Sequence, residues 1–79
     1  MQIPEKVIAD IRQEFERATA EHGKFNSAHE GYAVLLEEID ELWKEVKKRQ
    51  DKRDNLKMRN EAIQVATMAI RFIVDVLFE

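Results

Sequence analysis

The segment from Asn60 to Leu77 most constrains the fold, because its apolar residues cover most of a helical circumference. Phe72 lies on this circumference, and Phe78 just beyond the segment extends it. A helix of this kind is buried on several sides by other parts of a protein. Its polar exceptions share a strip of about 80° on a helical wheel, with Met68 among them: Glu61, Gln64, Arg71 and Asp75. These residues interrupt an apolar run that is too short to cross a bilayer comfortably, so we expect no membrane span.

Two further segments show helical periodicity. Pro4 suits the first turn of a helix and Gly23 suits its end. Between them, apolar residues recur at helical spacing: Val7, Ile8, Ile11, Phe15 and Ala18. A second helix is predicted to begin just after Ser27, because Ser27 with Glu30 three residues later is a capping-box pattern. Its core-facing sector is expected to contain six residues: Leu35, Leu36, Ile39, Leu42, Trp43 and Val46.

Residues 47–59 separate the second helix from the third and contain seven Lys or Arg and two Asp. We therefore expect a solvated helix end or connection there. The chain of 79 residues is predicted to form one all-α domain, 1–79, a small antiparallel bundle of three main helices. So short a chain has a thin core. We expect oligomerisation to complete the bundle, as a homodimer or homotetramer, most simply a two-fold dimer with the third helix near the interface.

Composition excludes several classes of function. The chain has no cysteine, which rules out disulfides, cysteine nucleophiles and thiolate zinc sites. Its net charge of −3 gives no overall positive field for nucleic acid, and residues 47–59 contain no aromatic side chain for base stacking. The N-terminal segment lacks the charged-then-apolar plan of a signal peptide. We therefore expect a cytoplasmic protein for which nucleic acid is an unlikely partner.

Two pairs of polar residues, each spaced three apart, point to a metal site between helices: Glu38 with Glu41, and Glu61 with Gln64. Residues three apart share a helical face, so two facing helices can direct both pairs at one ion. Oxygen ligands suit Mg²⁺ or Mn²⁺, and a cation would relieve the repulsion between the carboxylates. The alternative is a solvated shoulder of an amphipathic helix, with Glu61 favoured in a first turn by the helix dipole.

The segments HEGYAVLLEEIDELWKEV (29–46) and EAIQVATMAIRFIVDV (61–76) resemble the MazG-like branch of the all-α nucleoside triphosphate pyrophosphohydrolases. The signature of that family is ExxE on one helix and ExxD on the next. The resemblance implies a Mg²⁺-dependent enzyme, usually a dimer or tetramer, that splits nucleoside triphosphates into monophosphate and pyrophosphate. It assigns Glu38, Glu41 and Glu61 as catalytic, metal-binding carboxylates, and it places Gln64 at the metal position where the family has Asp.

Gln64 removes one negative charge from the metal shell. A catalytically weak or inactive module that binds nucleotide or protein is therefore the alternative function, and a helical oligomer whose polar strip only fixes register is a third. In many relatives a further helix supplies basic residues for the phosphates. Here we expect substitutes from Arg71, Lys44 or the basic residues 47–59. His29, at the start of the second helix, is a further candidate for a nucleotide pocket, although a surface or capping role is the simpler explanation.

Overall fold

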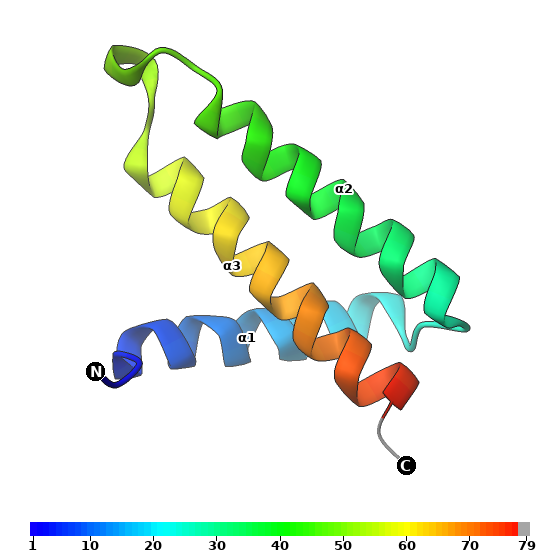
Figure 1. Ribbon diagram of the computed structural model, residues 1–79. Helices are drawn as coiled ribbons and strands as arrows, with labels where there is room; N and C mark the ends of the chain where they lie inside the picture. Colours follow the sequence, from blue (N-terminus) through cyan, green and yellow to red (C-terminus); the bar gives the residue numbers. More distant parts are fainter. Residues whose placement is uncertain (78–79) are drawn as a thin grey trace.

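Three helices form most of the part of the chain that the computed structural model describes, residues 1–77: α1 (Glu5–His22), α2 (Ala28–Val46) and α3 (Asn55–Phe72). A 3₁₀ turn, Gln50–Lys52, precedes α3, and a π-helical segment, Ile73–Leu77, follows it. Figure 1 shows α2 and α3 side by side and antiparallel, with α1 crossing α3. The predicted all-α fold of three helices is confirmed, and these 77 residues contain no β-strand. Phe78 lies outside the described residues.

The ends of α1 and α2 follow the sequence signals. Pro4 directly precedes α1, and its carbonyl accepts hydrogen bonds from the first turn. Gly23 ends α1 with a φ of 69°, a left-handed conformation that glycine adopts without strain, and its N–H donates to Thr19 O at 3.1 Å. Ser27 Oγ accepts a hydrogen bond from Glu30 N at 3.1 Å. The Glu30 carboxylate departs from the expected capping box, because it accepts from the backbone and side chain of Asn26.

α3 begins five residues earlier than the predicted start at Asn60. Asp54 is its N-cap, and the side-chain oxygen of Asp54 accepts hydrogen bonds from Leu56 N at 2.9 Å and Lys57 N at 3.2 Å. This cap satisfies N–H groups that otherwise lack partners in the first turn. Residues 47–59 were predicted to form a solvated helix end or connection, and residues 55–59 are the largely exposed first residues of α3. Only the predicted start near Asn60 was wrong, because the density of charge before it hides the capping signal of Asp54.

The core lies where α1 and α2 meet the second half of α3. Ala18, Phe25 and Met68 are its buried apolar residues. Four partly buried side chains pack against them: Val34, Leu35, Phe72 and Val76. None of the helices within residues 1–77 is both long and apolar enough to cross a membrane.

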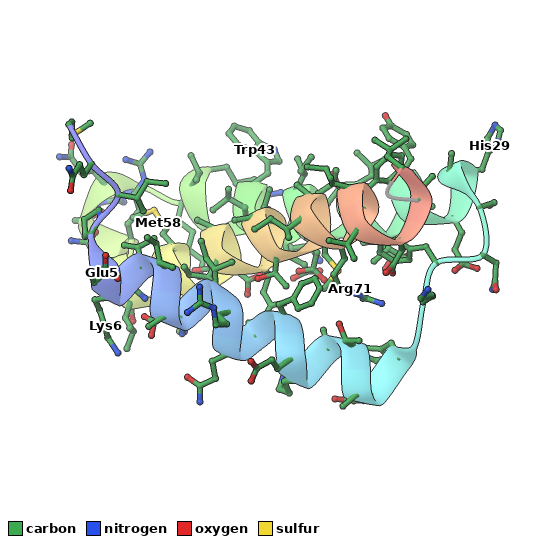
Figure 2. The ribbon with its side chains drawn as sticks, turned by 90° about the horizontal axis from the view of Figure 1, so that it is seen from below. Glu5, Lys6, His29, Trp43, Met58 and Arg71 are labelled. Carbon is green, nitrogen blue, oxygen red and sulfur yellow. The ribbon has the colours of Figure 1, made fainter. Side chains whose placement is uncertain are left out.

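One side of α2 is not covered by the other residues that the structure describes. Tyr32, Leu36, Ile39 and Trp43 are all exposed, Trp43 to 55%. Their spacing places them on one face, here named the α2 stripe. Figure 2 shows Trp43 on the side of α2 that faces away from α1. The expectation that Leu36, Ile39 and Trp43 are core residues of the single chain was therefore wrong: three helices cover only the half of the apolar sector that contains Leu35, Leu42 and Val46.

Gly31 is where α2 comes closest to the core aromatic rings. A Cβ placed there would lie 2.7 Å from Phe72 Cδ2 and 3.1 Å from Phe25 Cδ2. We predict that Gly31→Ala destabilises the protein by about 1–2 kcal/mol, because overpacking outweighs the ~1 kcal/mol gained in helix propensity. Urea unfolding checks this, with the exposed Ala33→Gly as a comparison for helix propensity alone. Equal or greater stability of Gly31→Ala would contradict the close packing at this position.

Candidate functional site

The antiparallel pairing of α2 and α3 places the two predicted pairs on facing helices. Burial raises the pKa of Glu38, and the nearby charges of Glu61, Glu41, Glu37 and Glu14 raise it further. The charge of Glu61 acts on Glu38 across the pairing of α2 with α3. Glu38, Glu61 and Gln64 are half-buried, whereas Glu41 is exposed. The structure therefore brings Glu38 and Glu61 together and leaves Glu41 at the outer edge.

Glu41 is paired with a cation on its own helix. Lys44 Nζ donates to Glu41 Oε1 at 2.9 Å, and this hydrogen bond raises the pKa of Lys44. The charge of Glu61 also contributes to the raised pKa, which places Lys44 near the acidic residues of both helices. Lys44, predicted as a substrate-binding residue, is thus part of the charge balance of the carboxylate site.

The donor set suits a hard cation, but the side chains are not gathered around one point. Within residues 1–77, no three His, Cys, Asp or Glu side chains lie close enough together to hold a metal ion as they stand. Carboxylate and amide oxygens are the ligands that Mg²⁺ and Mn²⁺ prefer. Glu38 also carries a charge that its neighbours and its burial disfavour. The chemistry of the donor set fits a divalent cation, and gathering these side chains around one would require Glu41 to turn away from Lys44.

A hollow of about 350 Å³ lies beside this carboxylate group, and we refer to it as the α1–α3 hollow. Glu38 and Gln64 belong to its wall. Its other charged and histidine residues come from α1, the following connection, α2 and α3, and apolar side chains complete it: Arg17, His22, Lys24, Glu30, Glu37, Arg71, Phe25, Val34 and Met68. A cavity with acidic groups on one side and basic groups on the other can hold an anion together with its counter-cation.

Arg71 borders the hollow, and it also ties the α1–α2 connection to α3. The residue is 2% exposed. One Nη donates to Gly23 O, the guanidinium carbon lies 4.5 Å from the centre of the Phe25 ring, and Asp75 is 3.9 Å away. Asp75 in turn accepts a hydrogen bond from Phe25 N at 3.1 Å. Arg71 Nε is buried without a hydrogen-bond partner. Arg71, predicted to bind substrate, is therefore held mainly by structural contacts in the chain itself.

His29 is placed differently from the other candidates. It is exposed at the start of α2, and it is not among the residues that line the hollow. Figure 2 shows its side chain pointing outward from that end of the molecule.

Sequence reasoning missed three residues of α1 and the connection: Glu14, Arg17 and Lys24. Arg17 Nε donates to Glu14 Oε1 at 2.9 Å, and Arg17 also pairs with Glu21. The spacing of Glu14, Arg17 and Glu21 at three and four residues was the available signal, but such groups are common on solvated helices. The Arg17 hydrogen bond lowers the pKa of Glu14, and the side chain of Gln64 lowers it further. A carboxylate of α1 therefore lies beside Gln64.

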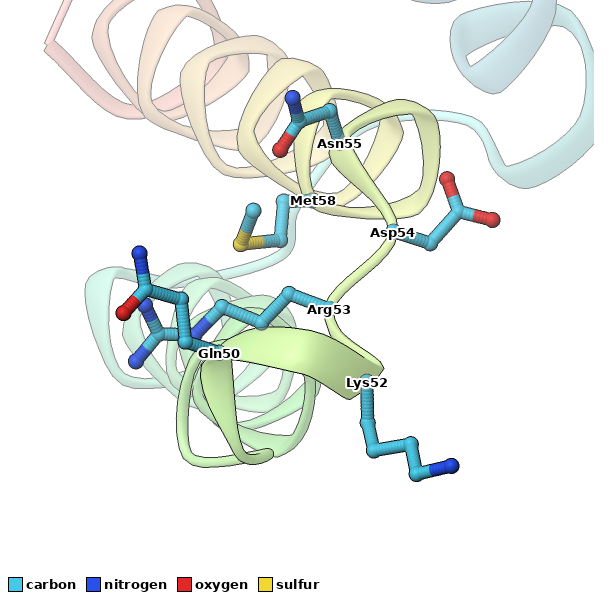
Figure 3. Close-up of a pocket in the computed structure, with 6 residues that line it drawn as sticks. All are labelled: Gln50, Lys52, Arg53, Asp54, Asn55 and Met58. Carbon is cyan, nitrogen blue, oxygen red and sulfur yellow. The ribbon is translucent and has the colours of Figure 1, made fainter.

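A larger hollow lies elsewhere, at the connection between α2 and α3 (Figure 3). It measures about 740 Å³ and is lined by Gln50, Lys52, Arg53, Asp54, Asn55 and Met58. Arg53 Nε donates to Val46 O at 2.9 Å, so this cation helps to end α2. None of these lining residues belongs to the carboxylate pairs, and the hollow has no acidic group apart from the capping Asp54.

The raised pKa of Glu38 predicts a pH-dependent change in stability. The folded protein holds this proton more tightly than the unfolded chain, so the free energy of unfolding falls as pH rises from the ordinary value of 4.5 through the raised pKa. We predict that Glu38→Gln is more stable than wild type at about pH 7 without metal, and that this advantage disappears below about pH 4. Urea unfolding at both pH values checks this, with the exposed Glu16→Gln as control. A constant difference between Glu38→Gln and wild type at all pH values would contradict the placement of Glu38.

Comparison with known proteins adds no further constraint. No family model, curated protein or solved structure matches the chain. The candidate site is therefore defined by its own residues: carboxylates and an amide on α2 and α3, next to a hollow with basic residues from α1.

Proposed function

We propose that this chain is a Mg²⁺-dependent nucleoside triphosphate pyrophosphohydrolase, with Mn²⁺ as a possible substitute for Mg²⁺. The observation that carries the proposal is the position of Glu38. This carboxyl group is partly buried among Glu61, Glu41 and Glu37 and forms part of the wall of the hollow to which Arg17 and Lys24 contribute cations. A site that combines uncompensated carboxylates with nearby cations matches the charge pattern of a metal–polyphosphate complex.

Each half of the site has its own task. Glu38, Glu41, Glu61 and the amide oxygen of Gln64 would hold the cation. A bound Mg²⁺ would polarise a phosphoryl oxygen and activate water, which phosphoanhydride hydrolysis requires.

Basic residues would hold the phosphate groups. Lys24 is exposed, and Arg17 is half-exposed and can exchange one of its two carboxylate partners for a phosphate. Arg71 contributes its positive charge from the buried side, where its contacts with Gly23 and Phe25 fix its position. His22 lies on the same wall. In this arrangement the phosphate groups would be bound mainly by residues of α1 and the α1–α2 connection. His29 and Lys44 would contribute less to phosphate binding.

Two observations favour the second function, a catalytically weak or inactive module that binds nucleotide or protein. Glu41 is already paired with Lys44, and Gln64 brings no charge to the cation. Both reduce the expected affinity for Mg²⁺. Nucleotide binding without turnover would favour this second function.

We also propose a homo-oligomer, most simply a two-fold dimer formed through the α2 stripe. The single chain buries only Ala18, Phe25 and Met68 as core apolar residues among those described, while four large side chains of one α2 face stay exposed. The stripe contains no charged residue, so two copies can face each other without burying unpaired charge. Antiparallel pairing of two α2–α3 layers would form a four-helix bundle with apolar residues between the layers.

The activity is tested with a panel of ribo- and deoxyribonucleoside triphosphates, measuring pyrophosphate release with Mg²⁺ or Mn²⁺. We predict that wild type releases pyrophosphate and that the rate falls about a hundredfold or more in Glu38→Gln and Glu61→Gln. Each carboxylate would help to hold the cation, which supplies several kcal/mol of transition-state stabilisation. Glu16→Gln, exposed on α1, is the matched control and should keep wild-type activity. No release from any substrate by wild type, or equal activity in all variants, would overturn the assignment.

The oligomer is tested by sedimentation equilibrium. We predict that wild type sediments as a dimer or tetramer and that Ile39→Arg, in the middle of the α2 stripe, sediments as a monomer, because a charge in an apolar interface has no partner. Leu56→Arg is the matched control, since Leu56 is equally apolar and is 64% exposed outside the stripe. A wild-type monomer, or dissociation by Leu56→Arg as well, would contradict an interface at the α2 stripe.

A further inference from the structure

Gln64 lies between two hollows. It borders the α1–α3 hollow together with Glu38. It also borders a second, separate hollow of about 400 Å³, which is lined by other residues of α1 and α3, Glu14 among them. Arg17 is the one other residue that lines both. The Gln64 amide thus has an α1 carboxylate on one side and the proposed metal site on the other.

The two ends of the amide differ, and a neighbouring carboxylate such as Glu14 can select between them. Arg17 donates to the Glu14 carboxylate at 2.9 Å and keeps it ionised, so this group can only accept hydrogen bonds. The NH₂ group of Gln64 is the end that a carboxylate attracts. The amide oxygen is then left for the side on which Glu38 and Glu61 lie. The lowered pKa of Glu14, due to Arg17 first and to Gln64 as well, agrees with this orientation.

The burial of Glu14 separates this arrangement from an ordinary surface ion pair. Arg17 and its other partner, Glu21, are 51% and 57% exposed at their side chains, whereas Glu14 is 14% exposed. Burying a carboxylate costs free energy unless it is paired and hydrogen-bonded. A pair that only stabilised the surface of α1 would not require this burial, and Glu21 shows what such a partner looks like.

We propose that Glu14 is a positioning residue of the metal site: it orients the amide of Gln64 toward the cation. The inference rests on the proposed function, because it concerns the ligands of the cation assigned there. Groups that orient a metal ligand typically change metal affinity by ten- to a hundredfold when removed. Gln64 can serve as a neutral ligand in this scheme only while Glu14 holds it.

The test is a calorimetric titration of the purified protein with Mn²⁺, which measures the Mn²⁺ affinity. The melting temperature of each variant is measured as well, without metal. Glu14→Gln should weaken Mn²⁺ binding about tenfold or more. Glu21→Gln is the matched control, because it removes the other carboxylate partner of Arg17 without touching Gln64, and it should bind Mn²⁺ as wild type does. Gln64→Glu alone should lower the metal-free melting temperature, because two carboxylates would then face each other.

The swapped variant, Glu14→Gln with Gln64→Glu, decides whether the pair acts as a unit. It exchanges the carboxylate and the amide, so it should restore both the metal-free melting temperature and the Mn²⁺ affinity toward wild-type values. A lower melting temperature of Glu14→Gln with unchanged Mn²⁺ affinity would show a purely structural role and overturn the inference. The inference would also be overturned if the loss of Mn²⁺ affinity in the swapped variant equalled the sum of the losses in Glu14→Gln and Gln64→Glu.

Glu38→Gln separates the inference from the proposed function. If wild type binds Mn²⁺, Glu38→Gln does not and Glu14→Gln binds normally, only the inference fails. If wild type binds no Mn²⁺, the cation site and its positioning residue fail together. If Glu38→Gln and Glu14→Gln both weaken binding while Glu21→Gln does not, the inference is supported whether or not a triphosphate is hydrolysed.

Discussion

The buried guanidinium of Arg71 is the interaction on which the arrangement of this small bundle depends. It reaches from α3 to the carbonyl of Gly23, lies against the ring of Phe25, and is accompanied by Asp75, which holds the backbone of Phe25. A buried charge is tolerated only when its surroundings supply hydrogen bonds and a counter-charge, so this group imposes one position on the connection. Because the connection joins α1 to α2, Arg71 also determines where Arg17 and Lys24 lie relative to the carboxylates. A structural contact thereby shapes the candidate site.

The site itself is governed by charge that the protein alone does not neutralise. Glu38 is partly buried between α2 and α3, where the charge of Glu61 acts on it. Lys44 forms its ion pair with Glu41 and not with Glu38. Like charges in such a place weaken the metal-free fold and strengthen the binding of any cation that arrives. In the proposed enzyme, the repulsion between carboxylates would lower the stability of the metal-free fold and raise the affinity for the cation. The small core leaves the single chain with little stability to lose. Association through the α2 stripe would then support function as well as fold.

Much of the fold could be predicted from the sequence, because its signals are local. Pro4, Gly23 and Ser27 mark helix boundaries through backbone chemistry, and they appear in the structure at the expected ends. Asp54 was missed because a capping residue inside a charged segment has no apolar periodicity beside it. The exposure of Trp43 could not be predicted, since a helical wheel shows which residues share a sector but not how wide a sector the neighbouring helices cover. The facing of Glu38 and Glu61 followed from spacing, whereas the approach of Glu14 to Gln64 depends on the crossing of α1, which no local pattern specifies.

The contacts of the connection with α3 also bear on the order in which the protein folds. Gly23 and Arg71 are 48 positions apart, and Phe25 and Asp75 are 50 apart, which is most of the length of the chain. α2 and α3, by contrast, follow each other directly and can form a helical hairpin from nearer contacts. Loop-closure entropy favours such a hairpin as an early structure and delays contacts between distant segments. On a ribosome, α1 would leave the exit tunnel before α3 and yet dock only after Arg71 has emerged, so its apolar face would stay open to chaperones or to a second chain until α3 has been synthesised.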